Sequence, residues 1–306
     1  MSPRITDFKG VLEGACRRGP FRVVVACGHD PAALQALALA EARGLAHGIL
    51  VGDPGLIGPA IDALPHRLQH AEIVDAADEA SAVRRAVELV RSHVGQILLK
   101  GKTQTATLMH AVLDREGGLR TGRLLSDAFL FEYPAPEGTR LLCVTDGGIN
   151  LTPDLTAKRQ IVENAVQLYQ SLGHARPRVA VLSAVETVIP GHGPSQDAAA
   201  LTKMAHAGQL SECEVEGPLS LDLAISPEAV AKKGHVGPVA GKADILLCPD
   251  IISANLLAKS TTYFARYPLA HVIMGASAPV LIPSRSDTPE AKLLSIALGA
   301  LTVKGG

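Results

Sequence analysis

The sequence predicts an α/β protein of two lobes, and three observations lead to this fold class. Short apolar runs alternate with stretches of helical period through most of the chain, which is typical of parallel strands joined by crossover helices. Two adjacent strand-like runs at residues 126–133 and 139–144 interrupt that alternation. A length of 306 residues is enough for two domains. We expect parallel-type sheets covered by helices, with a first lobe of residues 1–138 plus 275–306 and a second lobe of residues 139–274.

The first lobe is expected to begin with a strand of β-branched and small apolar residues. Asp30 before Pro31 is a cap and first-turn pair for a helix, and Asp78 begins another helix whose apolar residues recur at helical spacing. By these criteria the expected strands are residues 22–28, 47–53, 71–74 and 96–100, and the expected helices are residues 31–45, 78–93 and 105–114.

The second lobe follows the hairpin with a long helix and then returns to alternating elements. The expected helices are residues 154–172, 196–207, 227–233 and 251–264, and the expected strands are residues 178–185 and 243–248, with an extended edge at 213–218. Residues 270–274 lead the chain back to the first lobe.

The last stretch combines a short buried strand with a capped helix. Residues 280–282 are apolar and end at Pro283, while Thr288 and Pro289 form an N-cap and first-turn pair. Leu294, Ala297, Leu298 and Leu301 then predict a helix with one apolar face. Residues 284–287, Ser-Arg-Ser-Asp, therefore lie at a helix start, where backbone N–H groups and the Arg285 guanidinium favour an anion.

Composition excludes several classes of protein. The 29 basic and 30 acidic residues argue against nucleic acid or an anionic membrane as the main partner. Five scattered cysteines without a C-x-x-C pair, and histidines without metal-ligand spacing, predict neither disulfides nor a metal site. No signal peptide and no membrane-spanning apolar run is recognised, so we expect a cytoplasmic protein.

Polar clusters follow several expected strands, where ligands bind in open α/β sheets. They are Lys100-Gly-Lys-Thr103, Thr145-Asp-Gly-Gly148, Pro249-Asp250 with Asn255, and Ser284-Arg-Ser-Asp287. Two further segments belong with them, residues 118–123 and the glycine-bearing loop 238–242. Each cluster alone also fits an ordinary turn or cap. Together, cation-rich loops at strand ends indicate a phosphorylated ligand.

As an ordered set, these segments resemble the phosphate acetyltransferase and phosphate butyryltransferase family, more closely its butyryl branch. The resemblance covers roughly residues 20–303 and rests also on Gly217-Pro-Leu, Asp222-Leu-Ala-Ile-Ser, Val239-Ala-Gly-Lys-Ala-Asp244 and Lys259-Ser-Thr-Thr-Tyr-Phe264. It implies a fold similar to the isocitrate and isopropylmalate dehydrogenases, an active cleft between the lobes, and a homodimer. It also implies transfer of a short acyl group between coenzyme A, a substrate, and inorganic phosphate, with no permanently bound cofactor.

The resemblance also implies site residues. Ser284 and Arg285 match the pair that acts at the scissile centre. The acetyl branch uses an aspartate in the following helix as base, but this chain has Ala291 and Lys292 there, so Asp287 becomes the candidate base. A second departure is His110, which lies near the sequence position where the acetyl branch has a phosphate-binding arginine. The expected substrate contacts are Lys100, Lys102, Arg123, Asp146, Lys242 and Ser277.

Two other functions remain open from the sequence. A metal- and NAD-dependent dehydrogenase would share the implied fold, but it needs clustered aspartates and a dinucleotide site, and no G-x-G-x-x-G follows a strand. A non-catalytic protein that binds acyl-CoA or acyl phosphate is favoured only by the missing helix aspartate. The acyl chain length and the physiological direction of the reaction are not set by the sequence.

Overall fold

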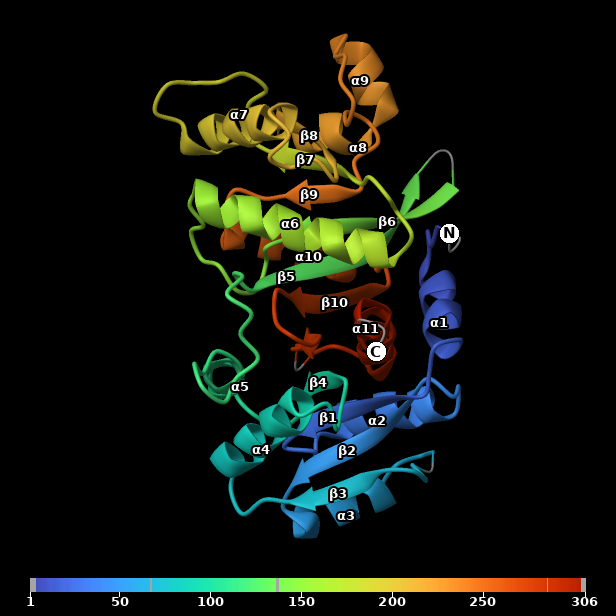
Figure 1. Ribbon diagram of the computed structural model, residues 1–306. Coiled ribbons are helices and arrows are strands. Elements are labelled where there is room, and N and C mark those ends of the chain that lie inside the picture. The colour runs from blue at the N-terminus through green and yellow to red at the C-terminus, as the bar shows by residue number, and fades with distance from the viewer. Residues whose placement is uncertain (1–3, 67, 136–137, 285, 304–306) are drawn as a thin grey trace. The chain divides into compact units, whose positions relative to one another are not determined.

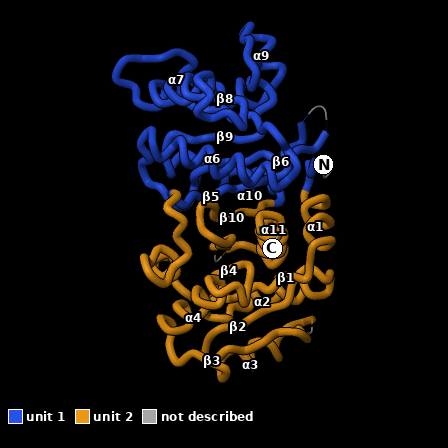
Figure 2. The backbone as a smooth tube through the Cα atoms, in the orientation of Figure 1, with its two compact units in different colours: residues 1–7, 124–268 blue, residues 8–123, 269–306 orange. Residues whose placement is uncertain are grey.

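A computed structural model describes residues 4–66, 68–135, 138–284 and 286–303 (Figure 1). The chain divides into two compact units: unit 1 comprises Met1–Asp7 and Leu124–Pro268, and unit 2 comprises Phe8–Arg123 and Leu269–Gly306 (Figure 2). The mixed α/β class expected from the sequence is confirmed. Among the described residues, no helix combines the length and apolar character needed to cross a bilayer.

Unit 2 is built on a mostly parallel sheet in the order β3-β2-β1-β4-β11-β10. Only β10 runs antiparallel to its neighbour β11 within this part of the described chain. The strands are β1 (Phe21–Ala26), β2 (Ala46–Gly52), β3 (Glu72–Asp75), β4 (Ile97–Lys100), β10 (Leu269–Met274) and β11 (Val280–Leu281). Since β1, β4 and β11 are parallel, the segments that follow them emerge at one edge of the sheet.

Helices cover both faces of this sheet, with α4 in front of the strands and α2 behind them in the view of Figure 1. The helices are α1 (Phe8–Cys16), α2 (Pro31–Glu41), α3 (Pro54–Asp62), α4 (Glu79–Arg91), α5 (Thr105–Val112) and α11 (Pro289–Thr302). The expectation of a single apolar face on α11 is wrong. Nearly all of its residues from Lys292 to Leu301 are buried, because α1 and α2 pack on one side and β10, β11 and β4 on the other.

Unit 1 has the strand order β5-β6-β9-β7-β8, with an antiparallel hairpin at one end and parallel pairs elsewhere. Its strands are β5 (Ser126–Ala135), β6 (Gly138–Thr145), β7 (Arg178–Leu182), β8 (Glu214–Leu219) and β9 (Ile245–Leu247). Its helices are α6 (Leu155–Ser171), α7 (Gly193–His206), α8 (Leu221–Ile225), α9 (Pro227–Lys233) and α10 (Ile251–Tyr263). The hairpin pairs along its length and lies wholly in unit 1, while the expected lobe boundaries at 138/139 and 274/275 stay a prediction.

Candidate active site

The loop between β11 and α11 is closed by its own hydrogen bonds. The Ser284 N–H donates to Asp287 Oδ2 at 2.7 Å, and the Asp287 N–H donates to the Ser284 carbonyl at 3.1 Å. Thr288 accepts a hydrogen bond from the Ala291 N–H, as expected of the N-cap. Ser284 therefore has a fixed backbone at the helix start. Arg285 lies outside the described residues, and its contact with phosphate stays a prediction.

Asp287 is held between main chain and a histidine that the sequence did not single out. Its Oδ2 lies 3.7 Å from Nε2 of His271, a buried residue of β10. Burial alone would raise the pKa of the Asp287 carboxyl, but His271, the Ser284 N–H and the charge of Lys292 outweigh that effect and lower the pKa. Asp287 is therefore an ionised carboxylate that also positions Ser284, and its role as a base stays a prediction.

Lys292 occupies the first turns of α11 and is only 3% exposed. Its Nζ donates to the Ser284 carbonyl at 3.1 Å, so a cation touches the same loop as Asp287. Burial lowers the pKa of Lys292, and the negative charges of Asp30 and Asp287 offset part of that effect. A lowered pKa makes the ammonium of Lys292 a stronger acid than that of a surface lysine.

A cavity of about 410 Å³ lies where the parallel strands of unit 2 end. It is lined by segments that follow β1, β3, β4 and β11: Asp30, Glu79, Lys100, Gly101, Lys102, Thr103, Gln104, Pro283 and Lys292. Three lysines thus face two carboxylates. The first turn of α5 also begins here, and its N-cap residue Gln104 makes no side-chain capping bond. Cations and a helix N-terminus in one cavity form an environment suited to an anion.

The Lys100-Gly-Lys segment reaches this cavity because Gly101 packs against the end of β1. Its N–H donates to the Ala26 carbonyl at 2.9 Å, and a Cβ at this position would lie 2.3 Å from the Cys27 carbonyl oxygen. Lys100 is buried, and its Nζ lies 3.3 Å from the Thr103 carbonyl oxygen. A glycine is therefore required between the two lysines by backbone packing.

Two other predicted segments of unit 2 are brought together. Ser277 N–H donates to the Leu119 carbonyl at 2.9 Å, and Thr121 Oγ1 donates to the Gly275 carbonyl at 2.6 Å. This pairing places the segment that contains Arg123 beside the segment that contains Ser277. Neither residue is among the described residues that line the cavity, and their substrate contacts stay predictions.

In unit 1, the predicted substrate residues Asp146 and Lys242 lie on separate loops. The buried Asp146 carboxylate accepts hydrogen bonds from the backbone N–H groups of Asp127, Gly148, Ile149 and Asn150 and from the Asn150 side chain. It therefore holds the turn after β6. Lys242 is exposed, and its N–H donates to the Val239 carbonyl at 3.0 Å. A direct contact of either side chain with substrate stays a prediction.

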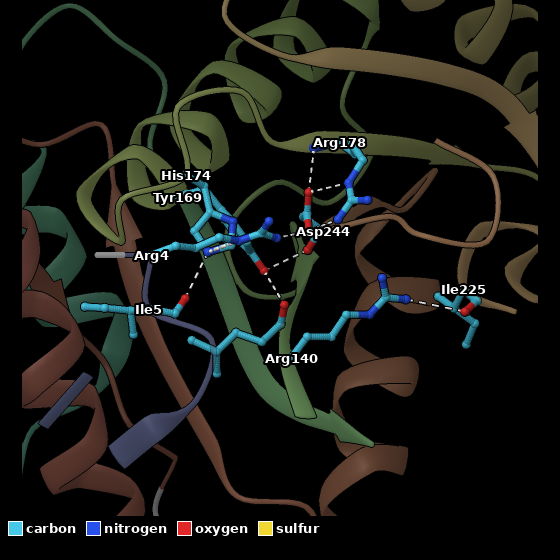
Figure 3. A network of polar contacts seen from close by, with 9 residues as sticks. Arg4, Ile5, Arg140, Tyr169, His174, Arg178, Ile225 and Asp244 are labelled. Carbon is cyan, nitrogen blue, oxygen red and sulfur yellow. Dashed lines mark hydrogen bonds and ion pairs between the residues drawn. The ribbon is translucent and has the colours of Figure 1, made fainter. Parts of the chain in front are cut away.

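Asp244 follows Lys242 by two residues, and its buried carboxylate is held by a network of partly exposed arginines (Figure 3). Arg178 donates to both carboxylate oxygens, from Nε at 2.9 Å and from Nη2 at 2.8 Å, and Arg4 donates at 3.3 Å. The Tyr169 hydroxyl donates to the Asp244 carbonyl at 2.7 Å. Burial alone would raise the pKa of Asp244, but Arg178 and Arg4 outweigh it and lower that pKa.

Comparison with known proteins decides the family. Residues 79–300 match the family model described as phosphate acetyl/butaryl transferase. A phosphate butyryltransferase from Clostridium acetobutylicum is 40% identical over 97% of this chain and 98% of its own length. A phosphate acetyltransferase from Rhizobium meliloti is 40% identical over 97% of this chain and 93% of its own length. The chain belongs to this family.

Solved structures agree with that membership and with the expected fold. A branched-chain phosphotransacylase from Enterococcus faecalis matches with a TM-score of 0.81 and 37% identity, over 92% of this chain and 99% of its own. A 4-hydroxythreonine-4-phosphate dehydrogenase from Klebsiella pneumoniae matches with a TM-score of 0.57 and 14% identity, over 94% of this chain and 100% of its own. The second likeness shows the fold alone, and it confirms a fold shared with dehydrogenases.

The sequence missed His271, Lys292 and Asp30 as members of the site. Asp30 was assigned only as a helix cap, and it does accept the Ala33 N–H at 2.7 Å. Lys292 carries one usable signal, since a lysine within an otherwise apolar helix needs a polar partner when buried. His271 carries no such signal, because its nearness to Asp287 depends on how β10 packs against α11.

Proposed function

We propose that this protein transfers a short acyl group between coenzyme A and inorganic phosphate: acyl-CoA + phosphate = acyl phosphate + CoA. Membership of the family supports the reaction class. The observation that carries the proposal is the fixed Ser284 loop beside a cavity lined by three lysines at the strand ends of unit 2. The relatives are named for acetyl, butyryl and branched-chain groups, so we propose a short acyl chain without choosing its length.

The thiol must lose its proton before it attacks, because the thiolate is the nucleophile. The thiolate sulfur then forms a bond to the acyl carbonyl carbon, and the bond from that carbon to the phosphate oxygen breaks. We assign Asp287 as the proton acceptor, since its carboxylate is ionised and lies in the Ser284 loop. The Ser284 hydroxyl is the proposed donor to the developing oxyanion.

The leaving phosphate needs cations and N–H donors. Lys100, Lys102 and Lys292 line the cavity, and Arg285 follows Ser284 in the chain. Two carboxylates, Asp30 and Glu79, face the same cavity and offset part of the positive charge. The Glu79 carboxylate already accepts the Thr103 hydroxyl at 2.6 Å, which lowers its pKa. We therefore assign the phosphate to the lysine side of the cavity. Further substrate contacts are proposed from the family resemblance, at Arg123, Ser277, Asp146 and Lys242.

The test is turnover with acetyl phosphate, butyryl phosphate and coenzyme A, followed by the absorbance of the thioester. We expect thioester formation with at least one of the two acyl phosphates, and the same rate after exhaustive dialysis against a chelator. Binding of coenzyme A without turnover would favour the non-catalytic alternative. Activity that is lost on dialysis and returns with Mg²⁺ would contradict the proposed chemistry.

We further propose a homodimer in the cytoplasm. The five cysteines are free, as is usual in a reducing compartment. On α10, the exposed Ile252, Leu256 and Tyr263 recur at helical spacing and form one stripe, continued by Phe264, which is 87% exposed. The same stripe on a second copy of the chain could pack against it and bury these apolar side chains. Light scattering after gel filtration should give a dimer mass, and Leu256→Glu should shift it toward the monomer.

A further inference from the structure

A second cluster of chemical groups lies in unit 2, formed by Glu41, His47 and His70. Glu41 ends α2, His47 is the second residue of β2, and His70 precedes β3. One possible ligand atom from each residue lies within 4.8 Å of the other two. Two imidazoles and one carboxylate at this separation match a known ligand set for Zn²⁺. The sequence did not predict this cluster, because His70 is 23 residues beyond His47 in the chain and Glu41 and His47 have no metal-ligand spacing.

The carboxylate of Glu41 is fixed before any ion arrives. Its Oε1 accepts the Gln69 N–H at 2.6 Å, and its Oε2 accepts the His70 N–H at 3.1 Å. The side chain is only 8% exposed, and Oε1 lies 3.2 Å from Nδ1 of His70. Backbone donors that orient a ligating carboxylate are the support that metal sites use. Little conformational entropy remains to be lost when a cation binds there.

His47 gives the second, independent observation. Its Nδ1 is shielded from solvent and has no hydrogen-bond partner among the described residues. A buried polar atom without a protein partner is costly, and coordination of a cation would satisfy this nitrogen. The rings of His47 and His70 have centroids 5.0 Å apart and are tilted by 47°. An ion pair between Glu41 and His70 alone would account for the contact between those two side chains but would leave Nδ1 of His47 without a partner.

We propose that Glu41, His47 and His70 bind one Zn²⁺ or a similar borderline transition-metal ion. Three protein ligands leave a fourth position for water. Imidazole ligands favour Zn²⁺, Ni²⁺ or Cu²⁺ over Mg²⁺ and Ca²⁺, which prefer sites made of oxygen atoms. The site joins the α2–β2 connection to the segment that enters β3, the edge strand of this sheet. Its role is to stabilise unit 2.

The position separates this metal site from the proposed reaction. His47 lies near the amino end of β2, paired with Arg22 at the start of β1, whereas the cavity lies beyond the carboxyl ends of the strands. The two sites therefore lie at opposite ends of the strands of one sheet. Removal of the metal should lower the thermal stability of the protein while the rate of acyl transfer remains the same.

The experiment uses the full chain without a histidine tag, freed of metal by dialysis against a chelator and titrated with Zn²⁺ by calorimetry. We expect one ion per chain, and a rise in Tm of about 5 °C at a hundredfold excess over Kd. Titration with Mg²⁺ in place of Zn²⁺ should show neither the binding of one ion per chain nor the rise in Tm. His70→Ala and Glu41→Gln should each weaken Zn²⁺ binding at least about tenfold. The matched control is His66→Ala, an exposed histidine of the same connection, which should bind Zn²⁺ as the wild type does.

Two results would overturn the proposal. One is the absence of Zn²⁺ binding by the wild type, and the other is equal binding by wild type and His70→Ala. Because His70 is 62% exposed, its replacement by alanine should fold normally and keeps the test decisive even if His47→Ala is unstable. Loss of acyl transfer on metal removal would also contradict a purely stabilising role, whereas the Zn²⁺ binding and Tm measurements test the site independently of whether the protein performs acyl transfer.

Discussion

Two aspartates of this protein, Asp244 in unit 1 and Asp287 in unit 2, both have a lowered pKa but have different surroundings. Asp244 is enclosed by two guanidinium groups that satisfy its carboxylate. Asp287 contacts a backbone N–H and lies near His271, within a loop that also touches a buried lysine and adjoins a cavity. A saturated carboxylate stabilises the fold, whereas one beside a cation-lined cavity is available for chemistry. Substitutions at the two positions should therefore change different measured quantities.

The largest effect is expected for Asp287→Asn, as a loss of kcat. If the carboxylate accepts the thiol proton, kcat should fall by about 10²–10⁴ with little change in Tm. The measurement is kcat from pH 6 to pH 9 beside a thermal melt. Asp53→Asn is the matched control, because Asp53 accepts the Gly55 N–H at the start of α3, away from the cavity. Near-normal kcat for Asp287→Asn at every pH would show that Asp287 is not the base.

Asp244→Asn should instead reduce stability. Removing one partner of a buried ion pair costs about 3–5 kcal/mol, and the lower end is expected because Arg178 and Arg4 are partly exposed. The folded fraction should keep its kcat. Denaturant unfolding beside Asp197→Asn measures the difference, because the Asp197 side chain, paired with Lys158, is 28% exposed whereas that of Asp244 is 3% exposed. A variant with normal stability and low kcat would reverse the roles that we assign to Asp244 and Asp287.

Arg285→Ala should produce a smaller change, confined to phosphate binding. Loss of one charge-assisted hydrogen bond costs about 1.5–3 kcal/mol, which corresponds to a rise in the KM for phosphate or acyl phosphate of about tenfold or more. Arg17→Ala, at an exposed position after α1, is the control for loss of positive charge. An unchanged KM for phosphate in Arg285→Ala would remove Arg285 from the phosphate site.

Local signals predicted the elements that position the site. The apolar run before Pro283, the Thr288 N-cap and the hairpin of β5 and β6 follow from nearest-neighbour chemistry, and the structure has them. The helices α1 and α3 were missed because they contain glycine, and α3 also Pro59, which lower intrinsic helix propensity. Packing compensates for this in α1, where Val11 and Ala15 are buried where α1 packs against α11.

The partners of the charged residues were not predictable. Arg4 and Arg178 are distant from Asp244 in the chain, and His271 is separated from Asp287 by a strand and a turn. No local pattern distinguishes a carboxylate that will be saturated from one that will adjoin a cavity. For the same reason the sequence could not show that the Asp146 carboxylate accepts hydrogen bonds from several backbone N–H groups, and the contact of Asp146 with substrate stays a prediction.

The smallest expected effect is a change in thermal stability at acidic pH, and it tests whether the negative charge of Asp244 accounts for the stabilisation by this residue. Its folded-state pKa lies below the usual value, which is about 3.9 in an unfolded chain. Its contribution to stability is therefore fully present above that pH and is lost as the pH falls through the folded-state pKa. The difference in Tm between wild type and Asp244→Asn should narrow as the pH falls from about 5 to about 3. A difference for Asp244→Asn that stays constant down to pH 3 would show that packing, and not the ionised carboxylate, stabilises unit 1 at this position.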